Sequence, residues 1–230
     1  MKLNTLRTGS AAAAVLALSF SLAACGSSDS EGATGSDTPA ASSTSSAAEN
    51  GGTEVDPASQ TFGDGCAAVP TDPNDKGSFA GMVQDPVATA ASNNPILTTL
   101  VAAVGATELG DTLNSADALT VFAPYDPAFT ELGTAVTDLV NGVADADSPQ
   151  TSPLAQILTH HVLGASDDPT AVVGEQTTLN GDTLTVKGDA ETGMTVSDGT
   201  VTANVICGNI PTANATVYVI DKVLTGATVK

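Results

Sequence analysis

His160 and His161 are adjacent and are the only histidines among the 230 residues, so acid–base chemistry would fall to them. An imidazole changes its charge near neutral pH, and either ring could act as a catalytic base. A histidine in an apolar segment is more often a buried, hydrogen-bonded core residue, and we expect that role for His161. Successive residues of a helix point about 100° apart. We therefore expect the two rings not to form one site.

Other residues that could do chemistry do not form a recognisable set. Asp145 and Asp147, and the pair Asp167-Asp168, could bind Ca²⁺, but they lack the ligand spacing of a calcium loop. The sequence contains no Gly-x-Ser-x-Gly element and no glycine-rich phosphate loop with lysine. We expect a protein that is not an enzyme, with no cofactor and no metal.

The first 25 residues have the pattern of an export signal. Lys2 and Arg7 precede an apolar run over residues 11–22, which is too short to span a bilayer as a helix. The run leads into Leu-Ala-Ala-Cys, which ends at Cys25 and resembles the lipobox of bacterial lipoproteins. We predict a lipoprotein signal peptide over residues 1–24 and lipid on the Cys25 thiol. The alternative is an ordinary signal peptide followed by a chance cysteine.

Cys66 and Cys207 are the two cysteines that remain. A pair left over in an exported chain is most simply a disulfide, because the compartment is oxidising. Closing a loop of about 140 residues stabilises a fold by roughly 5 kcal/mol in the chain-entropy account. The alternatives are two free thiols or a metal pair, although no histidine or third cysteine lies near enough in sequence to complete a zinc set.

The charge of the chain excludes several classes of partner. Its net charge is −20, with 26 acidic and 6 basic residues. Removal of residues 1–24 leaves four lysines, no arginine and a net charge of −22. Such a chain cannot neutralise nucleic-acid phosphates, is repelled by anionic lipid head groups, and has no arginine for a bidentate clamp. A partner must be basic or must bind without charge attraction.

Composition divides the exported chain into a tether and a domain. Residues 26–60 consist mainly of Ser, Thr, Ala, Gly and acidic residues without apolar periodicity, which predicts disorder. We assign residues 25–76 to the lipidated cysteine and a disordered tether, and residues 77–230 to one domain.

The domain changes its hydrophobic period halfway along. In the first half, pairs of a capping residue and proline predict short helices, with one strand over residues 119–123. In the second half, runs around Asn180-Gly181 and Asp198-Gly199 predict two hairpins, and residues 217–224 predict a last strand. Helices followed by antiparallel strands indicate an α+β domain. The pairs read as helix starts are Asp85-Pro86, Asn94-Pro95, Asp126-Pro127, Ser152-Pro153 and Asp168-Pro169.

Three segments resemble the signatures of the fasciclin (FAS1) domain family, in family order, within residues 78–226. Residues 120–129, with Phe-Ala-Pro before a short helix, resemble the first signature. Residues 154–163 resemble the central histidine segment, and residues 217–224 the terminal strand. The chain is most similar to the exported, lipid-anchored single-FAS1 surface antigens of actinobacteria, where Cys66 and Cys207 match a cysteine pair. Three ordered matches are more specific than any single motif.

The resemblance implies a single FAS1 domain, a wedge-like β-sandwich or barrel with several short helices packed on it. Two positions depart from the family pattern: His160 stands where tyrosine is usual, and Tyr218 where histidine is common. Both changes keep a ring with a polar tip, which suits a structural role. Integrin binding, which the resemblance links to this region in animal relatives, is therefore not expected of this chain. The signature residues that could form an interaction face are Phe122, Pro124, Asp126, Phe129, His160, His161, Tyr218 and Asp221.

The expected function follows from this architecture and from the resemblance. A lipid anchor, a tether and one rigid domain suit a cell-surface adhesion or interaction module that contacts matrix or envelope. The partners are then the membrane, through the lipid, and an unidentified protein or glycan, with no nucleic acid. We expect a monomer on the outer face of the cell membrane, partly shed to the medium. The alternative is a carrier or sensor of a small lipid or glycan, because the aliphatic composition could line an apolar pocket.

Overall fold

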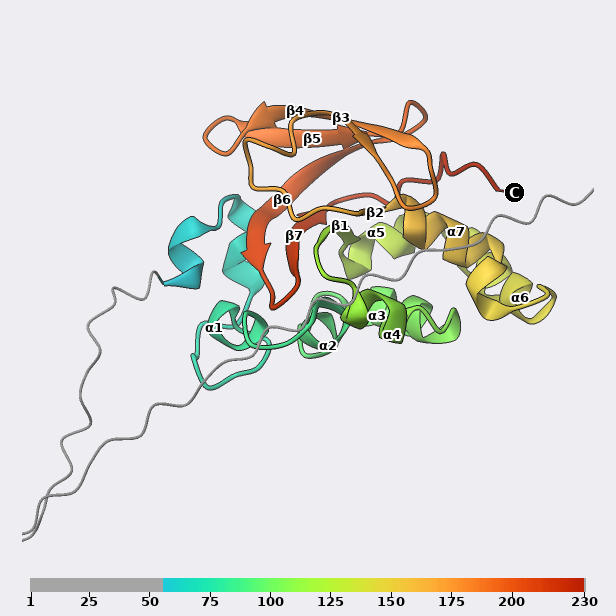
Figure 1. Cartoon of the computed structure of the whole chain (residues 1–230), viewed down its shortest axis with the longest axis horizontal. Coiled ribbons are helices and arrows are strands. Elements are labelled where there is room, and N and C mark those ends of the chain that lie inside the picture. The colour runs from blue at the N-terminus through green and yellow to red at the C-terminus, as the bar shows by residue number, and fades with distance from the viewer. Residues whose placement is uncertain (1–55, 230) are drawn as a thin grey trace, which may run out of the picture. The chain divides into compact units, whose positions relative to one another are not determined.

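The computed structural model describes residues 56–229. The predicted signal peptide, Cys25 and residues 26–55 of the predicted tether lie outside them. The described chain forms one seven-stranded sheet in the order β2-β1-β7-β6-β5-β4-β3 (Figure 1). A bridge between Leu163 and Thr178 joins the two edges, so the sheet is nearly closed into a barrel. The strands are β1 (Leu119–Pro124), β2 (Val162–Leu163), β3 (Gly174–Thr177), β4 (Thr183–Asp189), β5 (Gly193–Ser197), β6 (Thr202–Pro211) and β7 (Ala215–Ile220).

Strands β1 and β7 are neighbours in the sheet and are buried on both faces over nearly all of their length. They pair in parallel, with Phe122 opposite Tyr218. Because side chains alternate along a strand, Phe122 and Tyr218 point into the barrel, whereas Val121 and Val217 point toward the helices. This double burial explains why all six residues of β1 are buried.

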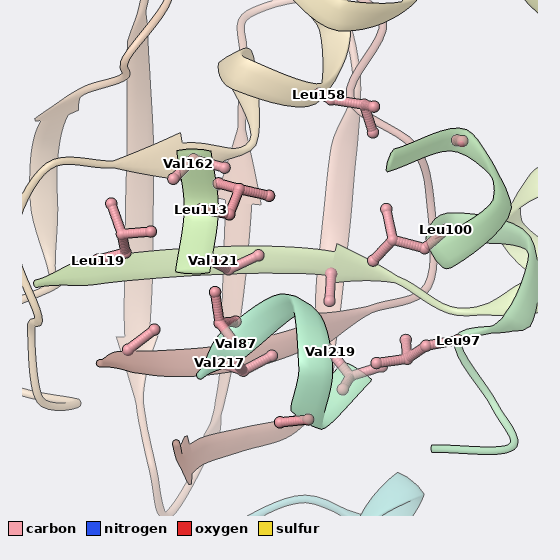
Figure 2. Packing of buried hydrophobic residues seen from close by; sticks show 14 of the residues in the cluster. Val87, Leu97, Leu100, Leu113, Leu119, Val121, Leu158, Val162, Val217 and Val219 are labelled. Atoms are coloured by element: carbon pink, nitrogen blue, oxygen red, sulfur yellow. The ribbon is translucent and has the colours of Figure 1, made fainter. Parts of the chain in front are cut away.

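Short helices cover the outer face of β1 and β7 and form the larger core. Figure 2 shows Val87 beside Val121 and Val217 in this core, to which Leu100 and Leu158 also belong. Among residues 56–229 no helix is long and apolar enough to cross a membrane. The helices are η1 (Pro57–Gln60), η2 (Asp64–Ala68), α1 (Phe79–Met82), α2 (Val87–Ser92), α3 (Thr98–Ala106), α4 (Gly110–Ser115), α5 (Asp126–Glu131), α6 (Thr134–Ala144), η3 (Pro149–Thr151) and α7 (Pro153–His160).

The predicted fold class is confirmed, with local differences. Both hairpins form, and the strand over residues 119–123 forms as β1. The expected last strand ends at Ile220, because the next residues turn away to bind other elements. The prediction of a helix after Asp168-Pro169 is wrong. Residues 169–173 form turns and bends, in which the Asp168 carboxylate accepts hydrogen bonds from the Thr170 and Ala171 N–H groups.

Ordered structure begins before residue 77, the expected start of the domain. Phe62 exchanges two backbone hydrogen bonds with Gly208 of β6. Four residues later Cys66 forms a disulfide with Cys207, as predicted, with Cα atoms 4.8 Å apart. The polar composition of this segment gave no sign of an ordered structure. One covalent bond and a strand-like bridge to β6 hold it in place.

Candidate functional site

His160 and His161 lie at the end of α7, beside the C-terminal segment of residues 221–229. Ser152 begins the helix, and its Oγ accepts the Ala155 N–H at 3.2 Å. Both rings are buried, with 1% and 3% of the residue exposed. Together with Asp182 and Asp198 they form a cluster that we call the histidine–aspartate clamp.

His161 has both ring nitrogens occupied by backbone groups. Its Nδ1 lies 2.8 Å from the Ile157 carbonyl oxygen, and its Nε2 lies 3.0 Å from the Leu224 nitrogen. An N–H must donate to the carbonyl, and the other nitrogen must accept from Leu224, so this ring is the neutral Nδ1–H tautomer. The pKa of His161 is lowered to about 4, because burial and the nearby His160 lower it by more than the Ile157 carbonyl and Asp198 raise it. The predicted structural role of His161 fits this geometry.

His160 lies between two carboxylates. Its Nδ1 is 2.9 Å from Asp182 Oδ2, and its Nε2 is 3.7 Å from Asp198 Oδ2. The second distance is too long for a hydrogen bond, so Nε2 is buried beside a charge without a hydrogen-bond partner among the described residues. The two aspartates therefore hold the ring from opposite sides.

The clamp fixes the C-terminal segment through alternate backbone N–H groups. Leu224 donates to His161, Gly226 donates to Asp198 Oδ2 at 2.7 Å, and Thr228 donates to Asp182 Oδ2 at 3.0 Å. In an extended chain, N–H groups two residues apart point the same way, so one cluster can bind all three. The expectation that the two histidines share no site needs correction: their ring centres lie 6.1 Å apart, and both support this segment.

Hydrogen bonds lower the pKa of both aspartates. Burial raises the pKa of Asp182, but the Thr228, Asn180 and His160 donors outweigh it and the net shift is downward. Burial also raises the pKa of Asp198, and the N–H groups of residues 200, 201 and 226 reverse that effect. Both carboxylates are therefore held in the ionised form, which suits them to accept N–H groups.

The aromatic and proline signature residues are core residues. Phe122 and Tyr218 are fully buried, with ring centres 5.7 Å apart, and Pro124 and Phe129 are also buried. The Tyr218 hydroxyl donates to the Asp167 carbonyl at 3.0 Å, and burial raises the Tyr218 pKa. An interaction face built from these residues would require the domain to open.

The two signature aspartates also serve the fold. Asp126 does not cap its own helix as expected: it caps α3, where its carboxylate accepts the Thr99 N–H and the Thr98 hydroxyl, both at 2.7 Å. Asp221 accepts the Asn204 N–H at 2.7 Å and the Asn204 side-chain amide at 2.6 Å. Asp126 thus joins the start of α5 to α3, and Asp221 joins the end of β7 to its neighbour β6.

Two residues that organise the clamp and one that caps α2 were missed by sequence reasoning. Asp182 and Asp198 stand in the hairpin turns, and the turn pattern accounted for them without suggesting a partner. Asn214 begins a formal Asn-x-Thr sequon, yet its side chain accepts the Val87 N–H at 2.9 Å and donates to carbonyls of residues 113 and 116. Its amide thus replaces the cap that Asp85 was expected to supply to α2.

The acidic pairs considered for Ca²⁺ serve locally or face solvent. Asp145 and Asp147 are exposed after α6, and Asp168 is engaged in its own turn. Within residues 56–229 no three His, Cys, Asp or Glu side chains gather as a metal site.

The fold and the site define a class of protein: an α+β barrel whose signature residues form the core and the clamp. The fasciclin domain family matches residues 95–226. The chain therefore belongs to the fasciclin family.

Named relatives match most of the chain. It is 43% identical over 176 residues to the cell surface glycolipoprotein MPB83 of Mycobacterium bovis, covering 74% of each chain. It is also 43% identical over 173 residues to the immunogenic protein MPB70 of the same species, covering 73% of this chain and 83% of the relative. A solved FAS1 domain pair from the insect cell adhesion molecule fasciclin I matches at 22% identity and a TM-score of 0.42, covering 56% of this chain and 43% of that chain.

Proposed function

We propose that this chain is a lipid-anchored cell-surface protein whose fasciclin domain is a non-enzymatic interaction module. The cleaved chain would carry lipid on Cys25, a tether, and the domain. The names of the relatives, a cell surface glycolipoprotein and an immunogenic protein, support exposure outside the cell. His160 and His161 are buried and engaged within the fold, which argues against a role in catalysis.

The junction between tether and domain is the observation that carries the proposal. The chain enters beside β6, where Phe62 bridges Gly208 and Cys66 is bonded to Cys207. Tension on the tether would therefore pass through a covalent bond into a central strand, instead of peeling the first residues from the surface. A disulfide at this place also requires an oxidising compartment.

The surface available for a partner lies away from this junction. Helix α6 lies at the opposite end of the described domain from η1 (Figure 1). Because the aromatic, proline and histidine signature residues are buried and the two signature aspartates are bound within the fold, we assign partner contact to other, exposed side chains. The strongly acidic chain favours a basic partner, whose binding would weaken with salt as the Debye length falls from about 10 Å at 0.1 M to about 3 Å at 1 M.

The anchor is tested in bacterial cells that express the full chain, as wild type or with Cys25→Ala. We expect wild type in the membrane fraction and the variant in the medium, both with the intact Cys66–Cys207 disulfide. A variant that stays membrane-bound to the same extent would refute the lipid anchor.

The interaction role is tested with the same cells. Wild-type cells and cells lacking the protein are applied to delipidated bacterial envelope and to a panel of animal matrix proteins, at low and high salt. Saturable binding that depends on the protein supports the module. Equal binding by both kinds of cell on every surface would refute it.

A further inference from the structure

The described domain contains an apolar cavity of about 150 Å³ beneath α6. Four helices, the end of β1 and Val223 line it, and its mouth lies between the exposed residues Ala102 and Val140. Its side chains are aliphatic or aromatic except for Thr99 and His161. The residues that define its walls are Ala102 and Ala106 of α3, Phe129 of α5, Val136 and Leu139 of α6, and Leu154 of α7.

Helix α6 covers the cavity from the edge of the larger core, against which Val136, Leu139 and Val143 pack while only partly buried. Its apolar residues Val136, Leu139, Val140 and Val143 recur at the spacing of one helical face, yet the helix has no fully buried residue. Val140 lines the cavity and is 42% exposed. The helix lies at the edge of the helical layer beside α7 (Figure 1). An amphipathic face over an unfilled space has room to pack against an additional apolar group.

The walls determine what chemistry can enter. His161 offers no free polar atom, because both of its ring nitrogens are hydrogen-bonded to the backbone. Thr99 is then the one other lining residue with a polar side chain, so a polar or charged group placed here would lose its hydration and could gain at most that one side-chain partner. An apolar cavity of about 150 Å³ stays dry and accepts a molecule of about the size of benzene, roughly six carbons.

A second apolar pocket of about 60 Å³ lies next to this cavity. The two share Leu158 and His161 as common walls. Movement of the Leu158 side chain would join them and lengthen the space along α7.

We propose that the cavity beneath α6 is a binding site for a hydrocarbon group of about six carbons, such as the end of an acyl chain. α6 acts as its cover. The apolar lining selects hydrocarbon over glycan. This site goes beyond the proposed surface role, because its walls are apolar and its ligand is small.

Probe binding to the full chain tests the site, with Cys25→Ala so that the protein carries no lipid of its own. The probes are benzene, a free small molecule, and decanoate, a chain whose carboxylate stays outside. Binding is followed through the methyl NMR signals of Val136, Leu139 and Leu154. We expect saturable shifts with at least one probe, and which probe binds distinguishes a small ring from a chain end.

Two leucine substitutions separate cavity binding from surface adsorption. Ala106→Leu places a larger side chain in the cavity, and we expect it to weaken probe binding at least about tenfold, or 1.4 kcal/mol. Asn141→Leu adds the same side chain on the outer face of α6 and should bind as wild type does. Ala102→Leu, at the exposed rim of the cavity, is the second variant if Ala106→Leu does not fold.

Three results would overturn the proposal: no saturable binding of either probe to wild type, unchanged binding in the folded cavity-filling variants, or equal loss in Asn141→Leu. These results do not test membrane anchoring or partner binding, which are measured separately by the experiments on cells.

Discussion

The Nε2 atom of His161 accepts a hydrogen bond from the backbone N–H of Leu224, 63 residues later in the chain, at 3.0 Å. This bond joins the end of α7 to the segment that follows the last strand. It forms only while the ring is neutral, since a protonated Nε2 is a donor and would face another donor. One histidine thus links the protonation state of the core to the docking of the C-terminal segment.

The stability of the domain should fall as the pH drops from 6.5 toward 4. The folded-state pKa of His161 is about 4 against an ordinary value of 6.5, so the unfolded chain binds the proton more tightly. A depressed histidine pKa gives stability that is complete above the unfolded value and is lost as the pH falls toward the folded value. The loss is about 3 kcal/mol. Urea unfolding at pH 7 and pH 4.5 measures most of it.

His161→Gln is the variant that tests this assignment. Glutamine can accept a hydrogen bond but does not titrate, so the variant should be less stable at pH 7 and should lose most of the pH dependence. The charged neighbours of the ring, His160 and Asp198, are unchanged in this variant, so the comparison with wild type isolates the effect of His161. An unchanged difference between pH 7 and pH 4.5 in His161→Gln would assign the effect to another group.

Asp182 and Asp198 should protect different amides of the C-terminal segment. Asp182→Ala removes the acceptor of the Thr228 N–H, and Asp198→Ala removes that of the Gly226 N–H. Hydrogen bonds to charged groups contribute about 1.5–3 kcal/mol each, so the matching amide should exchange faster by roughly one to two orders of magnitude. Hydrogen exchange resolved by residue measures both, and each variant is the control for the other. Equal effects of the two variants on both amides would contradict separate contacts.

The same carboxylates should add a second, more acidic step to the stability profile. Their pKa values are lowered from 3.8, so their contribution is present above pH 3.8 and is lost as the pH falls through their folded-state values. Unfolding measured between pH 4 and pH 2 should show a further decline in wild type. A smaller decline is expected in Asp182→Ala.

Loss of the disulfide should be the most destabilising of these changes. Cys66→Ala with Cys207→Ala removes a cross-link across 141 residues, worth about 5 kcal/mol in the chain-entropy account. Thermal unfolding of wild type, with and without reductant, and of the double variant measures this. Cys25→Ala is the matched control and should unfold as wild type does. A double variant as stable as wild type would show that the ends of the domain are held by packing alone.

Asp126→Ala should loosen α3 and leave α5 intact. The carboxylate caps the first turn of α3 through Thr98 and Thr99, and loss of a cap costs about 1 kcal/mol. Hydrogen exchange should quicken at the Thr99 amide and not at the Ala128 amide. Asp138→Ala, on the exposed face of α6, is the control. Faster exchange at the Ala128 amide instead would indicate that Asp126 caps its own helix α5, as expected from the sequence.

The elements with strong local patterns were predictable from the sequence. Asn180-Gly181 and Asp198-Gly199 each stand between alternating runs, and both hairpins form. Ser152-Pro153 begins α7 as a cap and first-turn pair should. By contrast, Asp126 and Asp168 have the same pattern, yet one caps a different helix and the other holds a turn. A capping residue needs only a nearby free N–H, and the fold decides which one is near.

The sequence by itself determined the α+β class, the fasciclin resemblance, the Cys66–Cys207 pairing and the core position of His161, because these depend on local period, motif order and composition. Only the tertiary structure decided that the aromatic signature residues belong to the two cores, and that Asp182 and Asp198 meet His160. It alone revealed that Leu224, Gly226 and Thr228 end on one cluster. Those contacts join residues far apart in the chain, and their distances depend on how the nearly closed sheet packs against its helices.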